Sequence, residues 1–378
     1  MTGKILRLEI TPLEALSFRY SGEFSPVARG PAVLGQTLLM PLPSTLLGAL
    51  SYIACTTMSR TTNGSILENY KVVCSFMKTT DVYIRGPYLI INDNIYLLLD
   101  NLLIKLPDKI NENTVRTYIR LKIAELESMK EKVNELRRLF DKMIVPVQFL
   151  GIGLKPEVKV VYREAPGLLY LAEFVDYLSL LSERVGKSIV NSVSINYDIV
   201  LRDSSITTNQ LNEIASKIGN TIRFGGESRM AKFRFDENLT LINVVKKIIV
   251  SEAEYYWLLV VSPIILDPPP TRSTIPPLSV EEIADELGDM IVEVKAFIGK
   301  LISLGLGFKE VEPRRRRALK IAIPPGSLIL AKMKNPVEIL VEGVGRSKCE
   351  EIECRRIGYG TVIPVPATNY ELRELGVC

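Results

Sequence analysis

The sequence predicts an α+β protein made of two units. In each half of the 378-residue chain, segments typical of strands alternate with a few segments typical of helices. Hydrophobic residues make up 47% of the chain and charged residues 24%, which is the balance of a globular protein and not of a disordered one. A change in composition near 186–188 places the expected boundary, so the two units cover residues 1–185 and 186–378.

The first unit is expected to begin with a strand over 4–10, because apolar and charged residues alternate there. A Gly- and Pro-rich loop follows over about 21–35. Pro43 then opens an apolar helix from Thr45 to about Met58, with Ser44 as the expected N-cap. Further strands are predicted at 70–77, 81–91, 95–106, 145–149, 158–162 and 169–174.

A long helix is predicted over about 112–143, inserted into the first unit. Its apolar residues recur at alternating spacings of three and four, which is the pattern of a heptad seam. They are Leu126, Met129, Val133, Leu136, Phe140 and Met143. Such a helix would be roughly 45 Å long. Two interpretations stay open: the helix packs against this chain's own sheet, or it is an arm that docks on a partner.

The second unit is expected to start with a strand over 193–202 and a helix from Thr208 to about 218. A helix over 242–249 and a buried strand over 255–265 follow. Five prolines within 267–277 indicate an extended surface loop. A short helix is predicted at 279–287, and strands at 318–323, 327–333 and 358–365.

The composition excludes several kinds of chemistry. The chain has no histidine, which excludes Ser-His-Asp catalysis, Cys-His catalysis and His-ligated zinc sites. The acidic residues are scattered and form no ligand motif, so we expect neither a metal nor a cofactor. An enzyme would have to use Tyr, Lys or Arg as its acid or base. The net charge of +4 argues against a nucleic-acid coat over the whole surface but leaves local basic sites open.

The cysteines and the apolar runs bear on location. The five cysteines are scattered, and Cys349 and Cys354 lack the spacing of a zinc knuckle, so we expect buried or free thiols in a reducing compartment. The N-terminal residues do not have the pattern of a signal peptide. The longest apolar run, 255–266, is too short to span a bilayer and contains Pro263. The sequence therefore predicts a cytoplasmic protein without membrane contact.

The loop before the first helix is one candidate site for phosphate. It carries Arg19 and Arg29, and it leads to Ser44 and Thr45 at a helix N-terminus. Free backbone N–H groups and the positive end of the helix dipole can hold a phosphate there. The alternative is that Ser44 only caps the helix and Gly48 only permits close packing.

The segment 222–234 (IRFGGESRMAKFR) is the most informative candidate. Gly225 and Gly226 allow the backbone to approach a ligand closely. Phe224 or Phe233 is available to stack on a base. The candidates for phosphate contact are Arg223, Arg229 and Lys232. The alternative is a glycine-bulged hairpin whose charges are solvated.

Two further basic segments lie near the end of the chain. Arg314, Arg315, Arg316 and Arg317 form a run of positive charge that suits an RNA backbone, or else a solvated loop. The tripeptide Gly358, Tyr359 and Gly360 follows two arginines and suits close backbone approach to nucleic acid. Neither a GxGxxG nor a Walker A motif is present.

Several of these segments together resemble the RAMP proteins of CRISPR systems, and among them the family of the third Cmr subunit of type III-B complexes. Residues 12–19 (PLEALSFR) and 41–50 (PLPSTLLGAL) resemble the family's opening strand, arginine-bearing loop and first helix. Residues 224–231 (FGGESRMA) resemble its GGE-x-R-x-A loop, and 323–328 (IPPGSL) its VPAGS strand start. Residues 358–360 resemble its glycine-rich loop, which is usually longer, and Glu14 stands where the family often has aspartate.

The resemblance implies two ferredoxin-like domains, related to RNA-recognition motifs, with antiparallel sheets. It implies a subunit without a catalytic role that holds the 5′ repeat tag of the crRNA. Its implied partners are the large polymerase-like Cmr subunit, a neighbouring backbone RAMP subunit and, indirectly, the target RNA. Two alternatives remain: a RAMP endoribonuclease that processes repeat RNA with Tyr or Lys chemistry, and a scaffold that binds only proteins. The lack of histidine disfavours the endoribonuclease, and the Arg/Gly loops disfavour the scaffold.

Overall fold

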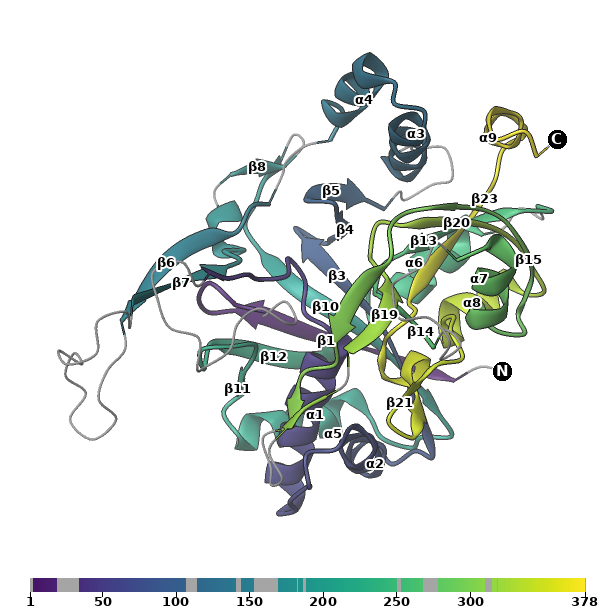
Figure 1. The fold of residues 1–378 in the computed structure, drawn as a ribbon. Helices are drawn as coiled ribbons and strands as arrows, with labels where there is room; N and C mark the ends of the chain where they lie inside the picture. The colour runs from purple at the N-terminus through teal and green to yellow at the C-terminus, as the bar shows by residue number, and fades with distance from the viewer. Residues whose placement is uncertain are drawn as a thin grey trace.

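The computed structural model describes residues 3–18, 34–106, 114–140, 144–152, 169–181, 183–185, 188–249, 253–267, 278–309, 315–317 and 319–377. Its helices and antiparallel sheets confirm the predicted α+β class (Figure 1). The expected strand at 158–162 and the proline-rich loop at 268–277 lie outside the described residues. So do Arg19, Arg29 and Arg314.

A seven-stranded antiparallel sheet forms the centre of the first unit, which in the structure extends to residue 236. The strand order is β11-β12-β1-β10-β3-β4-β5. Strands from far apart in the sequence pair here, and the two central strands, β10 and β3, are buried along almost their whole length. The strands are β1 (Lys4–Pro12), β3 (Asp81–Ile91), β4 (Asn94–Leu99), β5 (Leu102–Lys105), β10 (Val193–Arg202), β11 (Thr221–Arg223) and β12 (Met230–Asp236).

Three helices cover one face of this sheet: α1 (Pro43–Met58), α2 (Ile66–Phe76) and α5 (Thr208–Lys217) (Figure 1). Their apolar sides share one core with Leu6, Leu8 and Ile10 of β1. Along the chain, β1, α1 with α2, β3, β10, α5 and β12 follow a β-α-β-β-α-β sequence. Counted in chain order, the four strands lie side by side as 4-1-3-2.

The second unit has a four-stranded antiparallel sheet in the order β15-β20-β13-β23. The strands β13 (Tyr256–Val260), β15 (Ile291–Ile298), β20 (Leu328–Met333) and β23 (Val362–Pro366) alternate with α7 (Val280–Leu287) and α8 (Pro336–Glu342). The order along the chain and across the sheet is the same as in the first unit. The remaining elements are α6 (Leu241–Ile248), β14 (Ile264–Leu266), β16 (Ile302–Gly305), β17 (Phe308–Lys309), β18 (Arg315–Arg316), β19 (Leu319–Ile323), β21 (Lys348–Cys349), β22 (Ile352–Glu353), the 3-10 helix η2 (Cys354–Ile357) and α9 (Asn369–Glu374).

The boundary expected near residue 186 would divide the seven-stranded sheet. β10 lies between β1 and β3, and β12 pairs with the other edge of β1. All three pairings are long-range, so the composition change near 186 does not coincide with a gap in the sheet. The two sheets separate instead after β12, where α6 begins.

The segment 112–143 contains two short helices within its described part, and the prediction of one long helix is wrong. α3 (Thr114–Leu126) and α4 (Lys130–Arg137) are separated at Ser128, whose φ is +57°. Side chains of the predicted seam, Val133, Leu136 and Phe140, pack against the core shared by the two units. Leu126 and Met129 are exposed. The interpretation that this segment packs on the chain's own sheet fits these contacts.

The segment predicted as a strand at 70–77 belongs to helix α2. The apolar residues Val72, Val73, Cys74 and Phe76 suggested a strand. In the structure they are buried together with Ile66 and Tyr70 of the same helix. Ser65 caps the helix by accepting the N–H of Glu68. The local β-propensity was overridden by packing against α1.

A small sheet extends from the first unit. It contains β2 (Leu34–Gly35), β6 (Val147–Ile152) and β7 (Leu169–Phe174), and β6 and β7 project from the body at the left of the view (Figure 1). Short elements at 178–180, β8 (Arg184–Val185) and β9 (Ser188–Ile189), lead back to β10. In the part of the chain that is described, no helix combines the length and apolar character needed to cross a membrane.

Candidate nucleic-acid interface

The hairpin of β11 and β12 presents basic side chains on one face. In β12, Phe233 and its alternate neighbours are buried against the helices, whereas Lys232 and Arg234 are exposed. Arg223 of β11 is exposed as well. The register pairs Arg223 with Met230, two positions from Lys232, so the three cations lie on the sheet face opposite the helices.

The charges on this face are only partly neutralised. Arg234 forms an ion pair with Glu9 of β1 at 2.9 Å. Arg223 and Lys232 have no acidic partner among the described residues. Lys232 is paired with Thr11 of β1 on one side and with Thr221 of β11 on the other. We define Arg223, Lys232 and Arg234 as the basic face.

The Gly-Gly turn joins the hairpin to the start of the 19–33 loop. The N–H of Gly226 donates to the carbonyl of Ser17 at 2.7 Å. Gly225 has a φ of +94°, and a Cβ there would lie 2.5 Å from the same carbonyl. Phe18 packs edge-on against Phe224, with ring centroids 5.6 Å apart. The chain therefore leaves the described structure toward Arg19 from a point beside this turn.

Two aromatic expectations are wrong. Phe224 and Phe233 were candidates to stack on a base, but both are buried in the core of the first unit. Phe233 packs against Phe235 and not toward solvent. The alternation of β12 places every phenylalanine of the strand on the helix-covered face.

Arg229 is already engaged by protein groups. Its guanidinium pairs with Glu14, whose other oxygen accepts the N–H of Met230 at 2.9 Å. It also stacks 4.4 Å above the ring centroid of Phe174 in β7. The hydrogen bond from Arg229 lowers the pKa of Glu14. Arg229 thus connects the Gly-Gly turn, the end of β1 and the projecting sheet.

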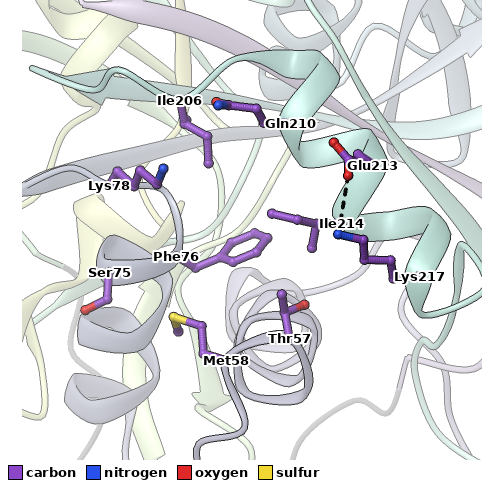
Figure 2. A pocket seen from close by; sticks show the side chains of 10 residues that line it. All are labelled: Thr57, Met58, Ser75, Phe76, Lys78, Ile206, Gln210, Glu213, Ile214 and Lys217. Carbon is purple, nitrogen blue, oxygen red and sulfur yellow. Dashed lines mark ion pairs between the residues drawn. The ribbon is translucent and has the colours of Figure 1, made fainter.

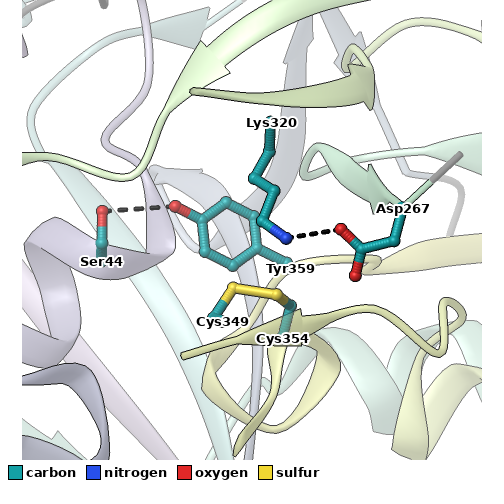
Figure 3. Close-up of a disulfide and its surroundings, with 6 residues drawn as sticks. All are labelled: Ser44, Asp267, Lys320, Cys349, Cys354 and Tyr359. Carbon is teal, nitrogen blue, oxygen red and sulfur yellow. Dashed lines mark hydrogen bonds and ion pairs between the residues drawn. A yellow bond between two sulfur atoms is a disulfide. The ribbon is translucent and has the colours of Figure 1, made fainter. Parts of the chain in front are cut away.

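Ser44 does not cap α1. The N-cap is Leu42 and Pro43 occupies the first helical position. Ser44 and Thr45 are half-buried, and the Ser44 hydroxyl accepts a hydrogen bond from Tyr359 at 3.3 Å (Figure 3). This N-terminus therefore faces the second unit.

The tripeptide 358–360 is buried, which does not fit the expected contact with nucleic acid. A Cβ on Gly358 would lie 3.2 Å from Pro43, and one on Gly360 would overlap the carbonyl of Val344. Burial raises the pKa of Tyr359 to about 12. Gly358 thus allows close packing against the first unit, and Gly360 allows close packing within the second.

Of the arginine run at 314–317, the structure describes Arg317 and the backbone of Arg315 and Arg316. Arg317 is largely buried; it pairs with Glu350 at 3.3 Å and donates to the carbonyl of Gly64 at 2.5 Å. The backbone of Arg315 and Arg316 forms β18, which pairs with β17. Arg317 thus has a structural role in holding the loop before α2.

Comparison with models of known protein families shows to which family this chain belongs. The family described as CRISPR-associated protein (Cas_Cmr3) matches residues 148–366, which is more than half of the chain. The chain belongs to this family.

Relatives of the Cmr3 family cover almost the whole chain. The CRISPR system CMR subunit Cmr3 of Saccharolobus solfataricus is 25% identical over 365 residues, covering 94% of this chain and 95% of the relative. Two cryo-EM structures of the type III-B Cmr-beta complex bound to cognate target RNA, one of them also with AMPPnP, contain a similar chain. Each solved chain is 22% identical to this chain, with a TM-score of 0.51. The similarity covers 94% of this chain in both cases, 95% of the solved chain in the structure with AMPPnP and 96% in the other. These structures support a shared fold.

The Cmr3-family match includes the whole β11–β12 hairpin. Sequence reasoning did not select Arg234 as a site residue, although the alternation of buried and exposed positions in 230–236 places it beside Lys232. Glu9 was missed because its pairing with Arg234 spans the sheet. No sequence pattern signals such a long-range contact.

The described part of this Cmr3-family chain contains no group of three side chains suited to hold a metal. Burial raises the pKa of Tyr88, Tyr118 and Tyr197 well above the ordinary value, which makes their phenols poor general bases. None of the three lies on the basic face.

A cavity of about 290 Å³ lies on the helix-covered side of the first unit, and none of its lining residues belongs to the basic face. Figure 2 shows the side chains that line it. Met58, Phe76 and Ile214 form an apolar floor between the ends of α1, α2 and α5. At its rim, Lys217 pairs with Glu213 at 3.3 Å. This lining offers no set of converging catalytic groups.

Proposed function

We propose that this chain is the Cmr3 subunit of a type III-B CRISPR complex that targets RNA, and that it holds the 5′ tag of the crRNA. Membership of the Cmr3 family supports the first part. The single observation that carries the second is the basic face beside the Gly-Gly turn. Two of its three cations lack an acidic partner among the described residues, so they are available for phosphates.

The proposed contacts are to RNA phosphates, because the basic face has no exposed aromatic side chain of the hairpin. All three phenylalanines of the hairpin are buried, so the hairpin offers no aromatic platform for bases. Cations and threonine hydroxyls on a flat sheet suit the phosphates of an extended strand. Such contacts fix position and register and carry no sequence information. Recognition of a particular tag sequence must then come from other groups.

The order of the helices and strands supports a division into two similar units. We infer that both units are ferredoxin-like domains, because each has a β-α-β-β-α-β order with strands arranged 4-1-3-2. In the first, the helices cover one face and leave the basic face on the other. The proposed protein partners are the large polymerase-like subunit and a neighbouring backbone RAMP subunit, with target RNA bound only indirectly.

The proposed role is not catalytic. The runner-up function, cleavage of repeat RNA by Tyr or Lys chemistry, needs an accessible acid or base near a bound phosphate. The basic face offers only Lys232 and two arginines. Incubation of the purified chain with repeat RNA should leave the RNA intact. Cleavage at one defined position, abolished by Lys232→Ala, would support the runner-up instead.

Crosslinking tests the proposed site directly. A crRNA with 4-thiouridine in its tag is assembled into the complex, irradiated and digested, and the crosslinked peptides are identified by mass spectrometry. We expect crosslinks within 221–234. A parallel crRNA with 4-thiouridine only in the spacer is the control and should not label these residues. Tag crosslinks confined to α1, α2 and α5 would contradict the proposal.

A further inference from the structure

A disulfide closes the hairpin of β21 and β22. Cys349 and Cys354 are bonded, with Cα atoms 4.9 Å apart, and both are buried (Figure 3). The expectation of free thiols is therefore wrong for this pair; it holds for Cys55 and Cys74. The pairing of Cys349 with Ile352 turns the chain back so that Cys354 reaches its partner.

The tip of this hairpin holds the start of a helix in the first unit. One carboxylate oxygen of Glu350 accepts the N–H of Ile66, the first residue of α2, at 2.7 Å. A carboxylate at this position is stabilised by the helix dipole. The other oxygen pairs with Arg317, which also donates to Gly64 just before the helix.

The residues after the disulfide hold the central sheet of the first unit. Arg356 pairs with Asp81, the first residue of β3, and with Glu353 at 3.2 Å. Arg85 of β3 is buried and donates to the carbonyl of Arg355 at 2.8 Å. These contacts begin one residue beyond Cys354.

A third contact reaches α1, where Tyr359 donates to Ser44. Residues 349–359, which we name the clasp, therefore contact α1, α2 and β3 of the first unit. The disulfide bridges the first residue of the clasp to its middle. It fixes the hairpin that carries Glu350 relative to the turn that carries Arg355 and Arg356.

We propose that the clasp is a redox-sensitive device that couples the two units of this chain. With the disulfide formed, the clasp holds α2 and β3 in place; with the disulfide reduced, these contacts open more often. This inference is independent of the proposed binding of crRNA. It concerns the chain's internal coupling and does not depend on which ligand the basic face takes.

The chemistry is thiol–disulfide exchange with a dithiol. A reductant thiolate attacks one sulfur, forming a mixed disulfide and releasing the other cysteine as a thiolate that takes up a proton. The second thiol of the reductant then displaces the remaining cysteine. Two electrons and two protons reach Cys349 and Cys354, and the reductant leaves as its cyclic disulfide. Because both sulfurs are buried, the clasp must open locally before attack.

The first measurement establishes the bond. The full chain is denatured under alkylating conditions without reductant, digested and analysed by mass spectrometry. We expect a linked peptide containing Cys349 and Cys354, and an alkylated Cys55. A fully alkylated chain from protein purified without reductant would overturn the proposal.

The second measurement tests the coupling. Hydrogen exchange is followed in the oxidised full chain and in the chain reduced with dithiothreitol, at peptides covering 64–72 and 354–361. On the chain-entropy account, opening a loop of this size speeds exchange by about ten- to forty-fold. Exchange at Ile66 that is unchanged on reduction would overturn the coupling, even if the bond exists.

Variants separate the disulfide from other effects of reductant. The double variant Cys349→Ser/Cys354→Ser should show the fast exchange without dithiothreitol. Cys55→Ser is the matched control, and it should retain the oxidised pattern and its response to dithiothreitol. If the double variant does not fold, the comparison of oxidised and reduced wild-type chain decides alone. Equal exchange in folded double variant and oxidised wild type would contradict the proposal.

Discussion

Arg229 pairs with Glu14 and stacks on the ring of Phe174, so its positive charge is used within the protein. The sequence predicted this arginine as a phosphate contact. The contacts indicate that its main effect is to hold the Gly-Gly turn against β1 and the projecting sheet. Its neighbours Arg223 and Lys232 lack such partners among the described residues.

Arg229→Ala should therefore lower the free energy of unfolding by about 1 kcal/mol, from one half-exposed ion pair and one cation–π contact. The folded state lowers the pKa of Glu14, so this stabilisation is present above the unfolded pKa and is lost as the pH falls through the folded pKa. Urea unfolding at pH 7 and pH 3 should show the difference between variant and wild type shrinking in acid. A variant of unchanged stability with weakened RNA binding would instead support the phosphate contact.

Asp198 should make stability depend on pH in the opposite direction. Its carboxylate is buried between Tyr88, at 2.6 Å, and the N–H of Ile242, at 2.7 Å, with Arg7 opposite it on β1. Burial raises the pKa of Asp198 to about 6. The folded state therefore holds a proton that the unfolded state releases near pH 4, and this group's contribution to stability falls as the pH rises from about 4 to 6.

Asp198→Asn removes that titration. The difference in unfolding free energy between variant and wild type should shift by roughly 2–3 kcal/mol in favour of the variant between pH 4 and pH 7. Urea denaturation at both pH values measures it. The same difference at both would show that Asp198 has an ordinary pKa.

Gly360 and Gly376 form a matched pair of left-handed glycines. Their φ values are +68° and +65°, but a Cβ on Gly360 overlaps the carbonyl of Val344, whereas one on Gly376 meets nothing within 4 Å. Gly376→Ala should cost about 1 kcal/mol, the cost of the conformation alone. Gly360→Ala should cost several kcal/mol or prevent folding. Thermal unfolding of both variants compares them, and equal losses would contradict the close packing at 358–360.

The two helices at 114–137 offer another contrast. Val133 packs against the core between the units, whereas Leu126 is 57% exposed. Val133→Glu should lower the free energy of unfolding by about 1–3 kcal/mol, because it brings a charge next to apolar neighbours. Leu126→Glu should change it by no more than about 0.5 kcal/mol. If both are neutral in the isolated chain but weaken subunit association, the interpretation as a docking arm is the better one.

Local patterns predicted most elements well. The alternation in 193–202 predicted β10 at its observed bounds, and Ser279 with Glu282 marks the start of α7 as a capping box. Errors arose where a tertiary contact outweighs local preference. Residues 70–77 have strand propensity but pack as a helix on α1. Ser128 interrupts a heptad pattern that continues in the sequence, because α4 turns back onto the core.

The candidate site was predicted in part. The sequence grouped Arg223 and Lys232 with two glycines, since these residues are close along the chain, and the segment adopts the hairpin that was the alternative interpretation. It could not reveal that Glu14 neutralises Arg229 or that Glu9 pairs with Arg234, because these contacts join distant segments. It also could not show that Val344 and Pro43 enclose the tripeptide 358–360. Each missing contact joins segments that are distant in the sequence, and no local pattern encodes such a contact.

We propose above that the basic face binds the phosphates of the crRNA tag. The most direct test of this proposal is the salt dependence of tag-RNA binding to the purified chain, for wild type and for Arg223→Ala/Lys232→Ala. Lys217→Ala, which removes an exposed lysine from α5 on the helix-covered side, is the matched control.

We predict that the double variant reduces the slope of log K against log salt by about 1.4, or about 0.7 for each lost contact to a single strand. Its affinity should fall at least tenfold at moderate salt, because charged hydrogen bonds contribute about 1.5–3 kcal/mol each. Lys217→Ala should match wild type in both. A folded double variant with the slope and affinity of wild type would contradict the account.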